Sequence, residues 1–517
     1  MMAMETNTIA ALLAGLAPVP FHAPWRRSAV DAPTWTVIGQ TLGAGEGDLV
    51  GLWGDVGAVH MAVRTPASAD PCVISLGVAG ASFPSIGRHH PPAIRLERAV
   101  CDLYGHIPAY APDRRGWLDH GQWELRAPLG ARTPAPRSDP ADYAFLPVHG
   151  HGLHQIPVGP VHAGIIEPGH FRFTANGETV VRLEERLGYV HKGIDALLTG
   201  ADVDRAARIA ARASGDATVA LGFAFALAVE AALGVEAPPR AAALRGVMAE
   251  LERIANHFGD IGAICNDAAF ALIHAHCGIF RERVLAASDR AFGHRLMMDR
   301  IVPGGIAQDI SADGAAAIVA ALTEIEPRFD EIVALYRDTP SLQDRTCGTG
   351  FVAPDLVKRW AAGGHVGRAS GRDFDARRDL AYPPYRGLGF DVPVLTAGDV
   401  DARVRVRIAE TRASIGMIKA WLTGLPAGPV RAPTPYPPAR AEEGRAAREG
   451  VAVTEAFRGD VLVWLRLAPG GLVERCHVRD ASWFQWPLLE AAIENNIVAD
   501  FPLCNKSFNC SYSGHDL

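Results

Sequence analysis

Five long segments rich in Ala and Leu occupy the middle of the chain and constrain its fold more than any other feature. Apolar residues recur in them at the spacing of a helix that buries one face. Each such helix must cover its apolar stripe, and neighbouring helices do this by packing into a bundle. We therefore expect a mainly helical unit with helices near residues 201–233, 238–258, 267–292, 314–336 and 399–422.

The N-terminal quarter has a different pattern, in which short apolar runs alternate with turns, as expected of strands. These runs cover residues 35–38, 49–53, 59–63 and 72–76. A Pro- and Ala-rich segment without periodicity, APLGARTPAPRSDP, begins at residue 127 and is typical of an extended connector. The sequence thus predicts a small α+β domain over residues 1–126, a linker over 127–143 and a second domain over 144–517.

Three further features belong to the second domain. Asn176-Gly177 between two apolar runs predicts a β-hairpin. Residues 426–450, rich in Pro, Ala and Arg, predict an exposed loop. Alternating residues 461–467 and 472–478 predict a late β-ribbon packed on the bundle.

Composition excludes several classes of protein. A chain of 517 residues with 49% hydrophobic and 21% charged residues is globular, and its net charge of -7 argues against nucleic acid as a partner. The apolar stretch at residues 217–235 is built of small residues and contains Glu230, so it predicts a buried helix rather than a membrane span. The N-terminus lacks a basic region before its apolar run and does not resemble a signal peptide, which predicts a cytoplasmic protein.

The eight cysteines are spread over the chain without any CxxC pair. Disulfides are not expected in a large chain without an export signal, so each cysteine is predicted to be a small buried apolar residue. The cysteines considered were Cys101, Cys265, Cys277, Cys347, Cys504 and Cys510.

Several segments resemble one family and occur in its order along nearly the whole chain. Residues 96–105 (LERAVCDLYG) and 113–115 (DRR) resemble the signature of the complex I subunit that docks beside the quinone module. The remaining segments resemble the large subunit of formate hydrogenlyase and hydrogenase-4: VGPVHAG at 158–164, EPGHF at 167–171, YVHKG at 189–193, ELERIANH at 250–257, RTCGTG at 345–350, GRASG at 367–371 and VTEAFRGD at 453–460.

This family fuses the C-type and D-type core subunits of complex I, and the predicted linker falls at the fusion. The resemblance implies an α+β fold with a small complex I C-like domain and a mainly helical domain with peripheral β-hairpins. The helical domain would resemble the complex I D-type chain and the nickel-iron hydrogenase large subunit. The resemblance also implies a small iron-sulfur partner subunit, which would hold an iron-sulfur cluster, and antiporter-like membrane subunits. Such a hetero-oligomer would lie peripherally on the inner face of the cell membrane.

The metal ligands of a nickel-iron hydrogenase are four thiolates in two CxxC pairs. The resemblance assigns these positions to Ser214, Ala217, Ser511 and Gly514, none of which is a thiolate, so we expect no metal site. The complex I branch binds quinone in the vacated cavity through a tyrosine and a histidine. The tyrosine position here is Gly215, which leaves quinone possible as a ligand but in doubt.

Four residues in the matched segments are candidates for lining this cavity or carrying protons: His162, Glu167, His170 and His191. The alternative is that they form structural hydrogen bonds. With His149, His151 and His154, the two histidines of the loop form a dense group, but its spacing fits no compact zinc site. The glycine pairs near residues 304 and 348 lack a nucleotide fingerprint, so we expect neither NAD nor another nucleotide to bind this chain.

The helix at residues 250–257 carries Glu250, Glu252, Arg253 and His257 and predicts a solvated charged face. The family resemblance raises the alternative that some of these groups face the interior and couple the cavity to the membrane arm. Taken together, the sequence predicts a peripheral-arm core subunit that couples electron transfer to ion translocation without a nickel-iron centre. A non-catalytic scaffold that joins a soluble enzyme to the membrane arm is the alternative.

Overall fold

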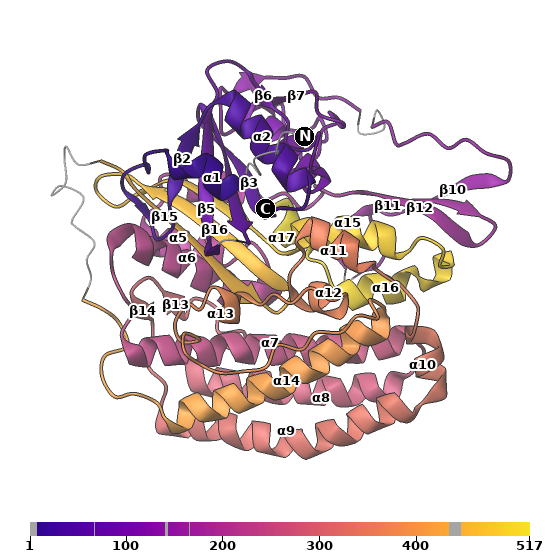
Figure 1. The fold of residues 1–517 in the computed structure, drawn as a ribbon. Coiled ribbons are helices and arrows are strands. Elements are labelled where there is room, and N and C mark those ends of the chain that lie inside the picture. The colour runs from indigo at the N-terminus through magenta and orange to yellow at the C-terminus, as the bar shows by residue number, and fades with distance from the viewer. Residues whose placement is uncertain (1–7, 67, 140–142, 165, 434–445) are drawn as a thin grey trace, which may run out of the picture.

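The computed structural model describes residues 8–66, 68–139, 143–164, 166–433 and 446–517, and combines several sheets with many helices (Figure 1). The N-terminal sheet has the order β2-β5-β4-β3, with β2 parallel to β5. Its strands are β2 (Arg27–Val30), β3 (Asp48–Asp55), β4 (Ala58–Thr65) and β5 (Ser68–Gly77), and its helices are α1 (Ile9–Ala14), α2 (Ala32–Gly43) and α3 (Ile94–Tyr104). Short pairs flank it: β6 (Ser82–Pro84) with β7 (Ile107–Ala109), and β8 (Leu125–Arg126) with β9 (Thr133–Pro134).

Three of the four predicted N-terminal strands are confirmed, but the strand predicted at residues 35–38 is wrong. That run lies within α2, whose first turn is capped by the Asp31 carboxylate accepting from Thr34 N at 2.9 Å. A proline early in the helix fits the first turn, where its missing N–H is not needed. Because Trp35 and Ile38 are three residues apart, they share the buried face of this helix.

A second sheet joins the two ends of the chain. Its order is β1-β15-β16-β17, in which β1 (His22–Ala23) runs parallel to β15 (Arg448–Ala456) and is followed by β16 (Gly459–Leu467) and β17 (Val473–Arg479). The late ribbon was predicted, whereas β15 was not, because it begins inside the stretch expected to be a loop. Residues 434–445 of that stretch lie outside the described residues.

The two sheets are in direct contact. The Trp53 ring of β3 lies 5.8 Å from the Trp464 ring of β16, between ring centroids, and Arg466 donates to Asp55 at 2.6 Å. Arg27 of β2 also pairs with Glu449 of β15. The N-terminal sheet is therefore packed directly against the second sheet and is not connected to it by the linker alone.

The helical unit lies on the other side of the second sheet (Figure 1). Four long helices form the bundle: α7 (Pro239–Asp267), α8 (Ala271–Phe292), α9 (Ala312–Asp338) and α14 (Val400–Thr423). Between them run the ribbon β13 (Ile301–Val302) and β14 (Gly305–Ile306) and the short helices α10 (Pro340–Thr346), α11 (Pro354–Trp360), α12 (Gly364–Ala369) and α13 (Ala376–Asp379). The predicted bundle is confirmed, although the segment 201–233 is divided into α5 (Val203–Ala210) and α6 (Thr218–Leu233).

Helix α6 is the part of the described chain that by length and composition could cross a membrane. In this fold 78% of its most apolar window is buried inside the protein, where the helix packs against β15 and β16. The predicted burial of this segment is confirmed.

A third sheet projects from the body of the molecule (Figure 1). It consists of β10 (Leu153–Val158), β11 (His170–Asn176) and β12 (Thr179–Arg186), with the predicted hairpin turn at Gly177, whose φ is +59°. The helices α15 (Ser482–Ala492), α16 (Phe501–Phe508) and α17 (Tyr512–Asp516) lie between this sheet and the bundle, whereas α4 (Ile194–Leu198) packs against α5 and β17.

The exposed stretch at residues 131–139 provides a test of the predicted domain boundary. Trypsin should cut after Arg132 or Arg137, since the Arg137 side chain is 62% exposed. Because of the contacts between the two sheets, the small and large fragments should stay together in gel filtration and separate only in denaturant. The double variant R132A/R137A should lose this cut; resistance of this stretch while the rest is digested would show that the boundary is wrong.

Candidate functional site

A cavity of about 370 Å³ lies where the turn before α6 meets the turn before α17. Residues 214–216 form one wall and residues 509–513 form the opposite wall. The loop around Ile166 and Glu167, which precedes β11, borders it. Two turns whose facing serines are 297 residues apart in the sequence thus share one cavity.

The two turns touch through serine hydroxyls. Ser214 Oγ lies 2.9 Å from Ser511 Oγ, and both serines are buried. The Ser214 hydroxyl donates to Asp216 Oδ1 at 2.8 Å, so its contact with Ser511 is one in which Ser511 donates. Ser511 Oγ also accepts from Gly514 N at 2.9 Å and thereby caps α17.

A buried guanidinium supplies the main positive charge of this cavity. Arg458 donates to both carboxylate oxygens of Asp216, at 2.8 and 2.6 Å, while only 3% of Arg458 is exposed. Burial favours the neutral acid, yet the Arg458 guanidinium outweighs it and lowers the pKa of Asp216. Asp216 is therefore held as a carboxylate that faces the cavity.

Lys192 links the two turns by hydrogen bonds to their backbone carbonyls. Its ammonium group donates to the Ala213 carbonyl at 2.9 Å and to the Ser513 carbonyl at 3.2 Å. Sequence reasoning missed Asp216 and Lys192 as parts of the site. Lys192 and Arg458 did lie in matched segments, but nothing in the residue types revealed that Arg458 lines this cavity or that Lys192 bonds to the backbone of the turns beside it.

Of the four candidate residues, the structure brings two toward the cavity. Glu167 lines it, and its Oε2 accepts from Ser513 N at 2.9 Å. His162 lies behind it, with Nε2 3.5 Å from the Tyr512 hydroxyl. Partial burial lowers the pKa of His162, so the imidazole is neutral at pH 7.

The other two candidates lie elsewhere. His170 packs against Phe145 and accepts from Arg172 Nε at 3.2 Å. His191 lines a separate, mainly apolar pocket, where its Nδ1 donates to the Asp516 carbonyl at 2.7 Å. His149, His151 and His154 are exposed on or beside the projecting sheet. The dense group of histidines in the sequence is therefore dispersed in the fold.

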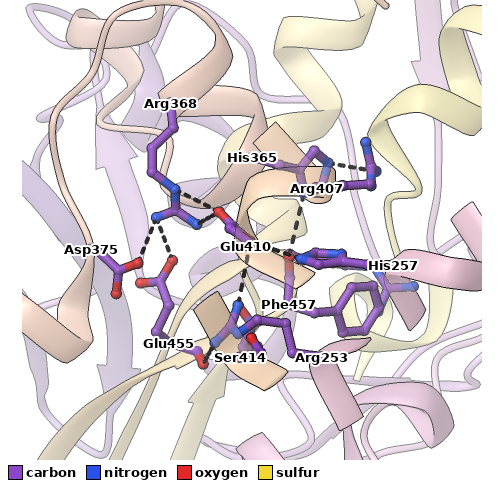
Figure 2. Close-up of polar contacts among 12 residues, drawn as sticks. Arg253, His257, His365, Arg368, Asp375, Arg407, Glu410, Ser414, Glu455 and Phe457 are labelled. Carbon is purple, nitrogen blue, oxygen red and sulfur yellow. Dashed lines mark hydrogen bonds and ion pairs between the residues drawn. The ribbon is translucent and has the colours of Figure 1, made fainter. Parts of the chain in front are cut away.

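The charged helix face predicted at residues 250–257 is wrong, because these groups are buried. Glu250 and His257 are 0% exposed and Arg253 is 1% exposed. Their partners come from distant segments. Arg377 donates to Glu250 at 3.0 Å, and His257 lies 2.8 Å from Glu410 (Figure 2). Charges at helical spacing look the same whether they face water or other charges, which is why the pattern was misleading.

Glu252 on the same helix is buried as well. Its carboxylate accepts from Val219 N at 2.7 Å and Ala220 N at 3.0 Å, at the start of α6. It thus satisfies two of the N–H groups that a helix leaves free at its N-terminus.

The N-terminal motif at residues 96–115 makes structural hydrogen bonds, both within the N-terminal unit and to the second domain. Asp102 accepts from the backbone of Trp117 and Leu118 at 2.7 and 2.8 Å. Arg115 donates to Glu184 of β12 at 2.6 Å, which ties the N-terminal unit to the projecting sheet. Trp117 Nε1 reaches His515 Nε2 at 3.4 Å and so contacts the C-terminal segment beside the cavity.

The prediction for the cysteines holds for five of them. Cys265, Cys277, Cys476, Cys504 and Cys510 are buried. It is wrong for Cys347, which follows α10 and is exposed, while Cys72 and Cys101 are half-buried.

Comparison with known proteins identifies the family. Residues 273–516 match the family described as the respiratory-chain NADH dehydrogenase 49 kDa subunit. Formate hydrogenlyase subunit 5 of Escherichia coli (strain K12) is 30% identical over 84% of this chain and 77% of its own length. Carbon monoxide-induced hydrogenase of Rhodospirillum rubrum is 31% identical over 69% of this chain and 97% of its own length.

The chain belongs to the family of the NADH dehydrogenase 49 kDa subunit and formate hydrogenlyase subunit 5. The resemblance seen in the sequence motifs is thereby confirmed. NADH-quinone oxidoreductase subunit 4 of Thermus thermophilus is 32% identical over 55% of this chain and 70% of its own length. One chain of the archaeal membrane-bound sulfane sulfur reductase shares the fold, with a TM-score of 0.66 at 23% identity over 71% of this chain and 99% of that chain.

The cavity contains the positions that the family resemblance assigned to metal ligands. Ser214 and Ser511 stand at two of these positions and bond to each other, and Gly514 donates to Ser511. The fourth position, Ala217, is buried and has no donor atom in its side chain. In the described ranges, no group of three or more His, Cys, Asp or Glu side chains is arranged to hold a metal ion.

The Asp216–Arg458 pair gives a test of the cavity's electrostatics. Replacing Asp216 by Asn leaves a buried guanidinium without its carboxylate, which should cost about 2 kcal/mol of unfolding free energy. Urea denaturation measures this loss. Asp204→Asn is the control, because that carboxylate is 61% exposed and pairs with Arg431 at 3.5 Å, so it should change stability by less than about 0.5 kcal/mol. Equal effects of the two substitutions would contradict the assignment.

Proposed function

We propose that the chain is the core peripheral-arm subunit of a membrane-bound respiratory complex related to NADH-quinone oxidoreductase and to hydrogenase-4 and formate hydrogenlyase. In this proposal it takes part in electron transfer coupled to ion translocation, and it lacks a nickel-iron centre. Residues 1–126 correspond to a complex I C-like domain, residues 127–143 to a linker and residues 144–517 to a complex I D-like domain. The relatives bear the names of subunits of multi-subunit complexes, which supports assembly with other chains.

The contact between Ser214 Oγ and Ser511 Oγ carries the proposal that nickel-iron chemistry is absent. Soft metals require thiolate ligands, and serine hydroxyls at neutral pH are neutral, hard donors. Cys510 adjoins one of the positions, but it is buried and its pKa is raised by burial, so it stays a neutral thiol. The residues therefore do not fit a nickel-iron group.

The polar cavity supports a subunit that takes part in the reaction over a non-catalytic scaffold. Asp216 and Arg458 are kept as ions at the wall, and Glu167 borders the opening. A quinone is the possible ligand here, although Gly215 stands at the position where a tyrosine would bond its head group. The iron-sulfur cluster would lie in a small partner subunit beside the loop of His162 and Glu167.

The partner set follows from the same proposal. The small iron-sulfur subunit and antiporter-like membrane subunits would form the complex, which would lie at the inner face of the cell membrane. The alternative, a scaffold that joins a soluble enzyme to the membrane arm, is favoured by one observation: four non-thiolate residues and Gly215 occupy the positions of the relevant ligands.

Metal analysis of the purified chain tests the first part. Inductively coupled plasma mass spectrometry should find no stoichiometric nickel, because no thiolate is present at the four positions. Reproducible one-to-one nickel together with hydrogen uptake would overturn the proposal.

Variants of the loop separate the active subunit from the scaffold. In the purified complex, Glu167→Gln and His162→Ala should lower coupled activity at least several-fold. Assembly should stay intact, because Glu167 is exposed and His162 is half-buried, and substitutions of such side chains usually cost little stability. His154→Ala, on the exposed part of the same arm, should leave activity unchanged. If both loop variants assemble and remain fully active, the scaffold function is correct. If neither assembles, the loop is structural and the proposed role for it fails.

A further inference from the structure

Seven charged side chains form one buried cluster where the bundle meets the second sheet, and Figure 2 shows its centre around Arg368 and Glu410. None of the seven is more than 2% exposed. They come from α7, α12, α13 and the residue before it, α14 and β15: Glu250, Arg253, Arg368, Asp375, Arg377, Glu410 and Glu455. Such a cluster must balance its charge, because an unpaired ion in the interior is strongly unfavourable.

The charges in this cluster do not balance when every group is ionised. It contains four carboxyl groups and three guanidinium groups. Two neighbouring ion pairs are balanced within themselves: Arg407 pairs with Asp260 at 3.1 Å, and Arg479 pairs with Asp460. Arg64 and Arg372, which contact the Phe374 ring, share Asp48, but all three side chains are partly exposed, so solvent screens their excess positive charge. One negative charge is therefore left over.

Two groups can hold the proton that removes this charge. One is His257, whose Nε2 lies 2.8 Å from Glu410, and the other is Glu455. The ring Nδ1 of His257 is buried without a hydrogen-bond partner among the described residues. A protonated imidazole would bury a further positive charge near Arg253 and Arg407, and burial together with these two guanidinium groups lowers the pKa of His257, so His257 stays neutral and donates through Nε2.

Among the four carboxyl groups, Glu455 has the weakest ion pairing with guanidinium groups. Arg368 Nη1 lies 2.9 Å from Glu455 and 3.3 Å from Asp375, so one nitrogen serves both. Asp375 has a second guanidinium, because Arg377 donates to both of its oxygens at 2.9 and 2.6 Å. The other contact of the Glu455 carboxyl group is the N–H of Ala376, which donates to it at 2.9 Å.

We propose that this cluster is a proton-binding site that holds one exchangeable proton on Glu455 at neutral pH. Release of the proton converts the neutral carboxyl to a carboxylate beside Arg368, and uptake reverses this, with no other bond made or broken.

The pKa values of Glu455 and of the groups around it agree with this arrangement. Burial, and then the negative charge of Asp375, raise the pKa of Glu455 to about 7 from its ordinary value of 4.5. Glu250 behaves oppositely: burial opposes ionisation, but Arg377 and Arg253 lower its pKa to about 2. Tyr382, which accepts from Glu455 N at 3.0 Å, and Tyr385, which donates to Glu250 at 2.6 Å, have pKa values raised by burial and stay neutral.

The proton-binding site is close in the chain to the cavity. Glu455 is three residues before Arg458, and the turn between β15 and β16 joins them. Arg253 donates to the backbone carbonyls of Glu455 and Ala456 at 2.8 and 3.1 Å and fixes this turn. Arg253 therefore fixes the backbone that carries both Glu455 of the proton-binding site and Arg458 of the cavity.

Infrared difference spectroscopy of the full chain tests the proposal, because a protonated carboxyl has a C=O stretch that a carboxylate lacks. Subtracting the spectra of Glu455→Gln from those of the wild type, over pH 5 to 9, should leave one such band that is lost with a midpoint near 7. Glu97 and Glu252, whose pKa values burial raises to about 7 and about 8, contribute equally to both proteins and cancel in the difference. Glu324→Gln, at a half-exposed carboxylate, is the matched control and should keep the band.

The pH dependence of stability and the variant Asp375→Asn provide two further tests. Because folded Glu455 binds its proton more tightly than the unfolded chain between about pH 4.5 and 7, its contribution to stability is present below that window and lost as pH rises through it. The wild type should therefore lose stability relative to Glu455→Gln as pH rises from 5 to 8. Asp375→Asn should move the midpoint of the band to lower pH. A difference between wild type and Glu455→Gln that lacks this band, or a midpoint unaffected in Asp375→Asn, would overturn the proposal.

Discussion

Arg368 is the residue on which the joining of bundle and sheet depends. Its guanidinium donates to Glu410 of α14 at 2.6 Å and to Glu455 of β15 at 2.9 Å, while 0% of it is exposed. One side chain of α12 thus links the helical bundle to the second sheet. Removing a partner from such a network costs several kcal/mol because the remaining charge is buried and unpaired. The position of β15 and of the turn that carries Arg458 follows from this link.

The second constraint is the C-terminal segment, which closes the cavity. Lys192 N donates to the Leu517 carbonyl at 2.6 Å, and Val190 N donates to Asp516 at 3.0 Å. These contacts help to hold Ser511 against Ser214. The hydroxyl contact therefore depends on long-range packing rather than on local sequence, and it joins two of the positions that the family resemblance assigned to metal ligands.

The sequence predicted elements that depend on periodicity and missed those that depend on partners. The four bundle helices and the hairpin at Gly177 were recoverable because apolar spacing and turn residues act locally. A short apolar run such as residues 35–38 fits a strand or a helix equally well, and here the Asp31 cap starts a helix that contains it. The candidate site was predicted in part: Glu167 lines the cavity and His162 lies near it, whereas His170 and His191 lie elsewhere. Asp216 could not be found from sequence, since its importance comes from Arg458, 242 residues away.

A cryo-electron microscopy map of the assembled complex tests the central claim most directly, namely that this cavity is held by hydroxyls and an ion pair instead of a thiolate-bound metal. The predicted result is a map in which Ser214 and Ser511 are in contact, Arg458 pairs with Asp216, and an iron-sulfur partner lies beside the loop of His162 and Glu167. A heavy-atom peak between residue 214 and residues 510–514, with the serines moved apart to bind it, would contradict the claim.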